Sequence, residues 1–143
     1  MSGQDLDAAI RDIEDEFALF SDWEERYAHV IDLGRAAPAL SDQEKTEANR
    51  IRGCASQVWL VTAFDPATGR LKFRGDSDAF LVRGLVALMV GLASDRTPAD
   101  VLKLDARALM ARLGLDEALT PQRSNGLAAL VARMRAEAEA ARA

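Results

Sequence analysis

The chain has 143 residues, enough for one domain with a substantial core but too few for two comfortable domains. Hydrophobic residues make up 49% and charged residues 29%, which is the balance of an ordinary soluble globular protein. The formal net charge of −5 argues against a general nucleic-acid-binding protein, because such proteins usually carry a basic excess. We therefore expect a single domain over residues 1–143 that has no nucleic-acid partner.

The sequence predicts no membrane segment and no secretory signal. The N-terminus is acidic and lacks a basic region followed by an apolar run. The longest apolar stretch, residues 79–93, contains Arg83 and is shorter than the roughly 20 residues that span a bilayer. We expect a cytoplasmic protein with no membrane partner.

A single cysteine, Cys54, limits the chemistry of the chain. No intramolecular disulfide can form, which fits a reducing compartment. A zinc or iron–sulfur site made of several of the chain's own thiolates is also excluded. We expect the chain itself to hold no metal and no cofactor.

The N-terminal part predicts two helices. Leu6, Ile10, Ile13 and Phe17 recur at helical spacing and predict an amphipathic helix over residues 5–20. In the next segment, Ser21 precedes Glu24 by three residues, a pattern typical of a capping box, so Ser21 is the expected N-cap of a helix that ends at Gly34. His29 lies on this second helix. Its expected role is structural, with a general base for the thiol as the alternative.

The middle of the chain predicts a small sheet. Residues 57–65 and 70–75 are strand candidates, and Pro66-Ala67-Thr68-Gly69 has the composition of a turn between them. Residues 49–52 are a candidate third strand. The expected fold is therefore α+β, with a small antiparallel sheet of about three strands packed against several helices.

The remaining segments predict further helices. Asp76, Ser77 and Asp78 are expected to cap an almost wholly apolar core helix that runs to about residue 93. Thr97-Pro98 and Thr120-Pro121 each mark a later helix start. Arg123 lies near the positive end of the last helix, where a cation is unfavourable, so we expect its charge to have a partner.

The strongest candidate for chemistry is Cys54. A thiolate is a good nucleophile, and the nearby Arg50 and Arg52 would favour that form. Gly53 permits a positive φ and hence a sharp loop that presents the thiol. The alternative is that Cys54 is a small buried packing residue.

Four segments of the chain resemble motifs of the SufE family of cysteine desulfuration proteins. The segments are Gly53-Cys54-Ala55-Ser56-Gln57-Val58-Trp59; Trp23-Glu24-Glu25-Arg26-Tyr27 with Ile31-Asp32-Leu33-Gly34; Gly75-Asp76-Ser77-Asp78-Ala79 with Gly84-Leu85; and Leu119-Thr120-Pro121 with Arg123-Ser124 and Gly126-Leu127. They cover the chain from about Trp23 to the C-terminus. The resemblance implies a SufE/IscU-like fold and a role in iron–sulfur cluster assembly.

The resemblance also implies a mechanism. The chain would not be an autonomous enzyme; it would accept sulfur as a persulfide on Cys54 from a pyridoxal-phosphate-dependent, SufS-like cysteine desulfurase and stimulate that enzyme. The sulfur would then pass to a SufBCD-like assembly scaffold, and the pyridoxal phosphate would belong to the desulfurase. Gly53, Ser56 and Gln57 would shape the loop, while Asp78 and Arg123 would be partner contacts. We further expect a loop that is buried at rest and swings out on docking.

Three other functions are considered. A thiol hydrolase would need a base beside Cys54, and His29 is the only histidine. A cysteine phosphatase would need an arginine to close a phosphate loop where the chain has Leu60. A non-catalytic helical adaptor, in which Cys54 only packs, is the alternative from another functional class.

Overall fold

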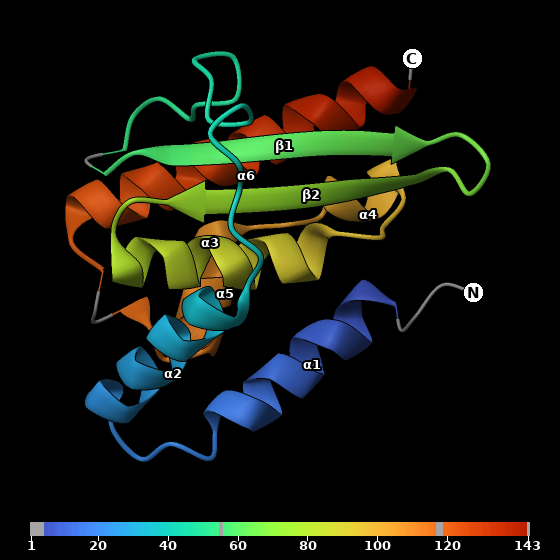
Figure 1. Ribbon diagram of the computed structural model, residues 1–143. Helices are drawn as coiled ribbons and strands as arrows, with labels where there is room; N and C mark the ends of the chain where they lie inside the picture. Colours follow the sequence, from blue (N-terminus) through green and yellow to red (C-terminus); the bar gives the residue numbers. More distant parts are fainter. Residues whose placement is uncertain (1–4, 55, 117–118, 143) are drawn as a thin grey trace.

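The computed structural model describes residues 5–54, 56–116 and 119–142 of the chain. Its elements, in chain order, are α1 (Leu6–Phe17), α2 (Trp23–Ala36), β1 (Val58–Asp65), β2 (Arg70–Ser77), α3 (Phe80–Ala93), α4 (Pro98–Val101), α5 (Ala106–Arg112) and α6 (Pro121–Arg142) (Figure 1). The predicted α+β class is confirmed, with helices packed against a small antiparallel sheet.

Both N-terminal helices begin at an aspartate. Asp5 caps α1 by accepting a hydrogen bond from the Ala8 amide at 2.8 Å. Asp22 caps α2 by accepting one from the Glu25 amide at 2.8 Å. The predicted cap, Ser21, is wrong by one residue, and its hydroxyl donates to the Glu25 carboxylate instead. Serine and aspartate are equally good N-caps, so the local sequence does not decide between them.

Strands β1 and β2 form the predicted hairpin. Val58 lies opposite Ser77, and Asp65 lies opposite Arg70 at the turn. Residues 66–68 of the turn are exposed, and Gly69 has a φ of 71°, a conformation that favours glycine. This turn lies at the far end of the sheet from the start of β1 (Figure 1).

The predicted third strand is reduced to one isolated bridge between Arg50 and Trp59, so the sheet of the described residues has two strands. The Ile51 amide donates to the Val58 carbonyl, and the Leu60 amide donates to the Asn49 carbonyl, each at 2.8 Å. The pairing is short because the chain turns on both sides of it: the Asn49 amide donates to the Thr46 carbonyl before the bridge, and Gly53, with a φ of 90°, follows it.

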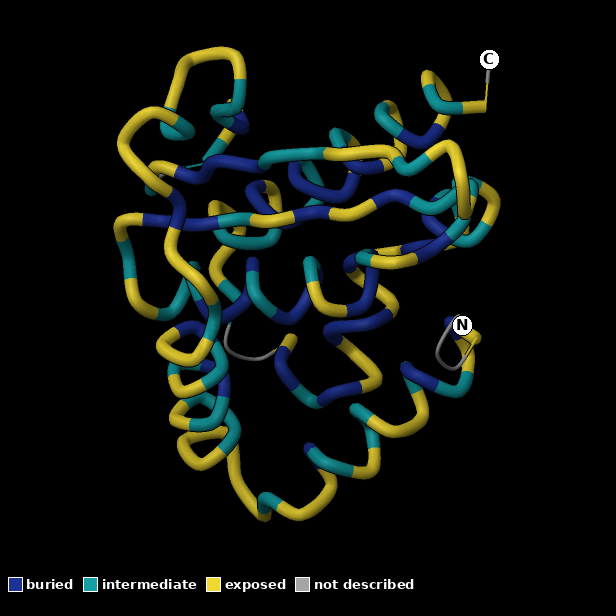
Figure 2. The backbone as a smooth tube through the Cα atoms, turned by 45° about the vertical axis from the view of Figure 1, so that its right-hand side comes forward, coloured by how far each residue is buried: buried dark blue, intermediate teal, exposed yellow. Residues whose placement is uncertain are grey.

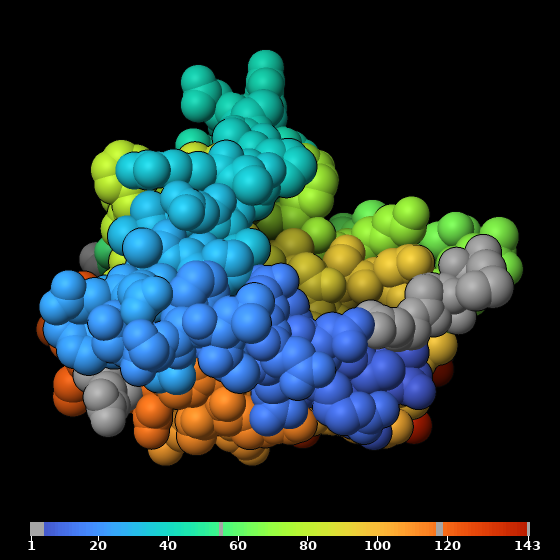
Figure 3. All heavy atoms as spheres, turned by 90° about the horizontal axis from the view of Figure 1, so that it is seen from below, coloured from blue at the N-terminus to red at the C-terminus, as the bar shows by residue number. Residues whose placement is uncertain are grey.

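The core lies between the sheet and the helices. Helix α3 packs against β2 on one side and α2 on the other, and α6 packs against α3 and β1 (Figures 1 and 2). Seen from below, the atoms of α1 and α2 form most of the surface (Figure 3). The largest fully buried side chains are Phe17, Leu71, Met89, Met110, Leu113, Leu115, Leu130, Met134, Val30, Val58, Val86 and Val101. Helix α3 is the core helix that its apolar sequence predicts.

The start of α3 differs from the prediction. Its N-cap is Ala79, which makes no side-chain capping bond. Asp76 and Ser77 belong to β2 and are buried, and Asp78 precedes the helix. The predicted capping role is therefore wrong for Asp76 and Asp78, whereas Ser77 Oγ accepts a hydrogen bond from the amide of the N-cap residue Ala79 at 3.3 Å. Both aspartates instead bind neighbouring segments of the chain.

Asp76 fixes the connection between α2 and the sheet. Its side chain is 3% exposed and accepts a hydrogen bond from the Leu40 amide at 3.0 Å. Arg83 Nε lies 3.3 Å from one carboxylate oxygen, and Lys45 Nζ lies 3.7 Å from the other. A buried charge is tolerated when it is paired in this way. The contacts hold the connecting segment against the end of β2.

Helices α2 and α3 cross at two glycines. A Cβ on Gly84 would lie 2.1 Å from the Val30 carbonyl oxygen, and a Cβ on Gly34 would lie 2.7 Å from the Gly84 amide nitrogen. The two backbones approach so closely that neither position has room for a side chain. None of the helices in the described part of the chain has the length and apolarity that crossing a membrane requires.

Replacing Gly84 with alanine tests this crossing. We expect Gly84→Ala to lower the free energy of unfolding by at least about 1 kcal/mol, because the added methyl group overlaps backbone atoms of α2. Gly91→Ala on the same helix is the matched control, since a Cβ there has no neighbour within 4 Å. Urea denaturation measures both variants. Equal stability of the two variants would contradict the close crossing.

Candidate active site around Cys54

Cys54 lies in a short loop whose two ends are held together. The hydrogen bond from the Ile51 amide to the Val58 carbonyl closes the base of the loop. Gly53 turns the chain with its positive φ, as the sequence predicts for this position. The loop therefore presents Cys54 at the start of β1, toward α6.

A second attachment joins the loop to the end of β2. The Gln57 amide donates to the Asp78 carboxylate at 3.0 Å, and the Asp78 amide donates to the Gln57 carbonyl at 3.3 Å. Both residues are exposed, so water competes for these bonds. Asp78 thus lies beside the cysteine loop.

The Cys54 thiol is half-buried against α6. Its Sγ lies 3.6 Å from the Gly126 carbonyl oxygen, which can accept a hydrogen bond from the S–H group. Burial raises the pKa of the Cys54 thiol, and the positive charge of Arg50 opposes this rise only in part. Arg50 therefore acts on the thiol pKa in the direction that the sequence predicts, but burial has the larger effect in this resting geometry.

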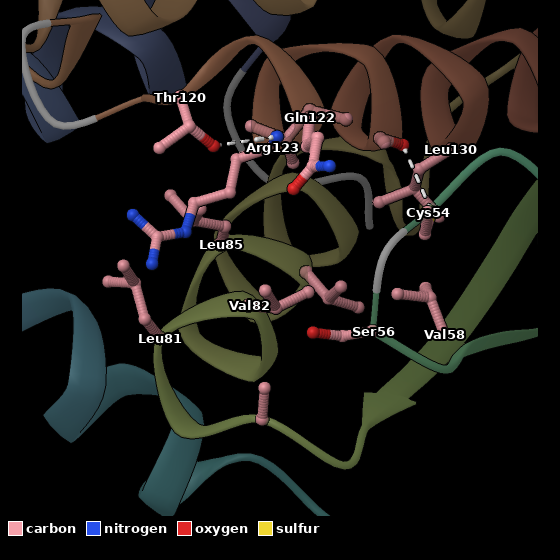
Figure 4. Close-up of a pocket in the computed structure, with 14 residues that line it drawn as sticks. Cys54, Ser56, Val58, Leu81, Val82, Leu85, Thr120, Gln122, Arg123 and Leu130 are labelled. Atoms are coloured by element: carbon pink, nitrogen blue, oxygen red, sulfur yellow. Dashed lines mark hydrogen bonds between the residues drawn. The ribbon is translucent and has the colours of Figure 1, made fainter.

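A pocket of about 240 Å³ opens beside the thiol (Figure 4). Its lining comes from the loop, β1, α3 and α6, and consists of Cys54, Ser56, Val58, Ala79, Leu81, Val82, Leu85, Val86, Thr120, Gln122, Arg123, Gly126, Leu127 and Leu130. Most of these side chains are aliphatic, so the interior is apolar. Polar groups of Ser56, Thr120, Gln122 and Arg123 supply the hydrogen-bonding part of the lining.

Two of the predicted site residues line this pocket from different elements. Arg123 and Cys54 both line it, although they are far apart in the sequence. The Arg123 amide donates to Thr120 Oγ1 at 3.2 Å in the first turn of α6, and its side chain extends along the pocket (Figure 4). Ser56 also lines the pocket, whereas Gln57 contributes through its backbone bonds to Asp78.

His29 lies elsewhere. Its Nε2 pairs with the Glu16 carboxylate, and its ring packs against Phe17 and Phe20 with centroids 5.2 and 4.9 Å away. It joins α1 to α2 and is not among the residues that line the pocket of Cys54. The geometry thus favours a structural role over a general base.

Comparisons with known proteins place this chain in a family. The SufE family model, described as an Fe-S metabolism associated domain, matches residues 11–138. The chain belongs to the SufE family. It is 46% identical over 134 residues to an uncharacterised SufE-like protein of Rhizobium etli, covering 92% of this chain and 90% of the relative. A second uncharacterised SufE-like protein, from Rhizobium meliloti, is 42% identical over 132 residues, covering 89% and 92%.

A solved structure shows the same fold. The solution structure of a hypothetical protein from Thermus thermophilus superimposes with a TM-score of 0.71 at 19% identity, covering 95% of this chain and 94% of the other. This SufE-family chain therefore has the expected fold. Within the described residues, no group of three or more potential ligands (His, Cys, Asp or Glu) is placed to hold a metal ion.

The glycines of the SufE-like motifs have physical roles in this chain. Gly53 turns the cysteine loop, and Gly34 and Gly84 allow the close crossing of α2 and α3. Gly126, which belongs to the last of the four motifs, faces Cys54. The only sequence feature that singles out Gly126 is its place inside an expected helix, where glycine is unfavourable and therefore indicates a special packing role.

Asp78→Ala tests the attachment of the loop. We expect faster hydrogen exchange of the Gln57 amide, because the variant removes the carboxylate that accepts its hydrogen bond. Asp65→Ala is the matched control: the Asp65 carboxylate accepts from the Ala67 amide at 2.9 Å in the exposed hairpin turn, at the other end of the sheet. Unchanged exchange at Gln57 in the first variant would show that this contact does not restrain the loop.

Proposed function

We propose that this protein is a persulfide carrier that accepts sulfur on Cys54 from a pyridoxal-phosphate-dependent cysteine desulfurase. The observation that supports this best is the position of Cys54: a thiol on a short, closed loop beside a largely apolar pocket. Membership in a family associated with iron–sulfur metabolism supports an assembly scaffold for iron–sulfur clusters as the proposed destination of the sulfur. The desulfurase is SufS-like and the scaffold SufBCD-like in this proposal, and both act in the cytoplasm.

The transfer is a thiol–disulfide type exchange. The Cys54 thiolate attacks the outer sulfur of the persulfide on the desulfurase cysteine. A new S–S bond forms on Cys54 as the old S–S bond breaks, and the electron pair leaves with the desulfurase thiolate. The products are Cys54–S–SH and a free desulfurase thiol that can accept sulfur again. Removal of sulfur from the desulfurase explains the proposed stimulation of its turnover.

One cysteine is sufficient for a carrier. A second thiol nearby would attack the persulfide, form an intramolecular disulfide and release the sulfur. The chain has no other cysteine, so this loss cannot occur within one molecule. The apolar lining of the adjacent pocket would also limit contact of a sulfur species with aqueous oxidants.

Transfer requires the loop to move. At rest, Cys54 is half-buried against α6. The thiol must therefore turn outward to reach the persulfide of the desulfurase. Gly53 is the hinge in this proposal, and the exposed bonds between Gln57 and Asp78 are among those that restrain the loop. Hydrogen exchange around Cys54 should therefore change when the desulfurase is added.

Intact-mass spectrometry tests the carrier directly. After incubation with a cysteine desulfurase and free cysteine, we expect the wild-type protein to gain sulfur that a reductant removes, and the desulfurase to turn over faster. Cys54→Ser should show neither effect, because a hydroxyl cannot form a persulfide. The variant should keep its fold, since serine is close to cysteine in size.

The adaptor alternative predicts a different outcome. If Cys54 only packs, the wild type would gain no sulfur with any of several desulfurases, and Cys54→Ser would retain function in a cell that depends on this protein. That pair of results would reject the carrier.

Arg123 is proposed as a contact to the desulfurase because it lies in the lining of the same pocket. We expect Arg123→Glu to raise the concentration of carrier that half-saturates the desulfurase by about tenfold, equivalent to ~1.4 kcal/mol of binding, because the charge at the contact is reversed. Arg135→Glu is the matched control: it makes the same charge change at an exposed position further along α6. Equal effects of the two variants would reject a specific contact at Arg123.

A further inference from the structure

Phe80, in the first turn of α3, is a large apolar side chain that the fold leaves exposed. Its relative exposure is 71%, whereas later residues of the same helix, from Gly84 to Ala93, supply much of the buried core. The packing of α3 therefore does not require a phenylalanine at position 80. Single exposed apolar side chains are common on protein surfaces, so exposure alone assigns no role to this residue.

The position of Phe80 beside the pocket distinguishes it from the other exposed apolar side chains. The large hydrophobic side chains that are exposed in the described part of the chain are Leu19, Trp23, Phe64 and Phe80. Among these four, only Phe80 has both of its chain neighbours, Ala79 and Leu81, in the lining of the pocket. Consecutive Cα atoms lie about 3.8 Å apart, so Phe80 lies directly beside the pocket that contains the thiol.

This part of α3 lies at the same end of the sheet as Cys54. Val58, at the start of β1, pairs with Ser77, at the end of β2, so the cysteine loop and the turn into α3 leave the sheet at one end (Figure 1). A protein that brings a sulfur atom to Cys54 must contact this end of the molecule. A standard interface buries about 800 Å² of each partner. Such an interface extends from the thiol over the neighbouring Phe80.

Arg35 gives this exposed surface a specific chemistry. Its guanidinium carbon lies 5.9 Å from the centroid of the Phe80 ring, within the range of a cation–π contact. The ion pair of Arg35 with Asp32 is 3.8 Å long and largely exposed, so water weakens it. Aromatic side chains and arginine are enriched where proteins bind one another. An apolar recess bordered by a carboxylate would fit the ring and the guanidinium together.

We propose that Phe80, with Arg35 over its ring, is an anchor by which the sulfur-donating cysteine desulfurase binds this protein. The ring enters an apolar recess of the desulfurase, and an acidic side chain at the border of that recess pairs with Arg35. This inference rests on the proposed function, because the partner that must reach Cys54 is the same desulfurase. Neither side chain of the anchor lines the pocket of Cys54, so the anchor acts on binding and not on the sulfur transfer itself.

Phe80→Ala tests the anchor in an assay of desulfurase turnover against the concentration of this protein. We expect the half-saturating concentration to rise at least about fivefold, because loss of the ring leaves the recess unfilled. Maximal turnover should stay that of the wild type. The variant should keep its fold, since the side chain is exposed and alanine favours a helix.

Phe64→Ala is the matched control. Phe64 has a relative exposure of 42% and lies opposite Leu71, near the hairpin turn at the other end of the sheet. This variant should leave the half-saturating concentration and the maximal turnover unchanged. Equal half-saturating concentrations for Phe80→Ala and the wild type, or a fall in maximal turnover alone, would overturn the anchor.

A second copy of this chain is the alternative occupant of the surface at Phe80. In that case light scattering would show a dimer that Phe80→Ala converts to monomers, and the half-saturating concentration for the desulfurase would stay the same. This pair of results would overturn the anchor for the desulfurase.

Binding measured without free cysteine separates the anchor from the proposed function. Calorimetric titration of the desulfurase with this protein forms the complex without sulfur transfer. Weaker binding of Phe80→Ala than of Phe64→Ala, together with no sulfur on wild-type Cys54, would support the anchor and reject the carrier. Sulfur on wild-type Cys54, together with equal binding of the two variants, would reject the anchor and retain the carrier. No binding of the wild type to several desulfurases would overturn both.

Discussion

The buried carboxylate of Asp76 is the contact on which the arrangement of the site depends. It lies at the end of β2, where the Leu40 amide, Lys45 and Arg83 surround it. Removing one partner of such a group leaves an uncompensated charge in the interior, typically at a cost of about 3–5 kcal/mol. These contacts fix the course of the segment that follows α2. That segment delivers Ile51 to its hydrogen bond with β1 and so closes the base of the cysteine loop.

The site combines a rigid frame with a weakly attached loop. The frame consists of β1, α3 and α6, whose buried side chains form one core. The loop is joined to that frame by a few backbone bonds and by the packing of Cys54 on Gly126. Segments with few buried contacts open at a small fraction of the global free energy of unfolding. A loop of this kind can change position while the fold that receives it stays intact.

Local patterns predicted the helices, the hairpin and the turn at Gly53 before Cys54, because periodicity, turn composition and an isolated glycine are visible within short windows. Ser21 was wrong as a cap because the adjacent Asp22 serves equally well. Three other features depend on segments that meet only in the folded chain, so short windows of sequence could not predict them. These are the short pairing of residues 49–52, the contacts of Asp76 and Asp78, and the packing of Cys54 against Gly126. The thiol shows the same limit: Arg50 lowers the pKa of Cys54, as its place in the sequence predicts, but burial against the distant helix α6 raises this pKa by more.

The hairpin turn offers a practical route for following the protein during its reaction. Residues 66–68 are exposed and lie at the opposite end of the sheet from the cysteine loop (Figure 1). Exposed loop tips are the places where inserted segments are best tolerated. A short peptide tag at this turn would anchor the molecule to a surface or carry a fluorophore, leaving the only thiol of the chain free for its chemistry.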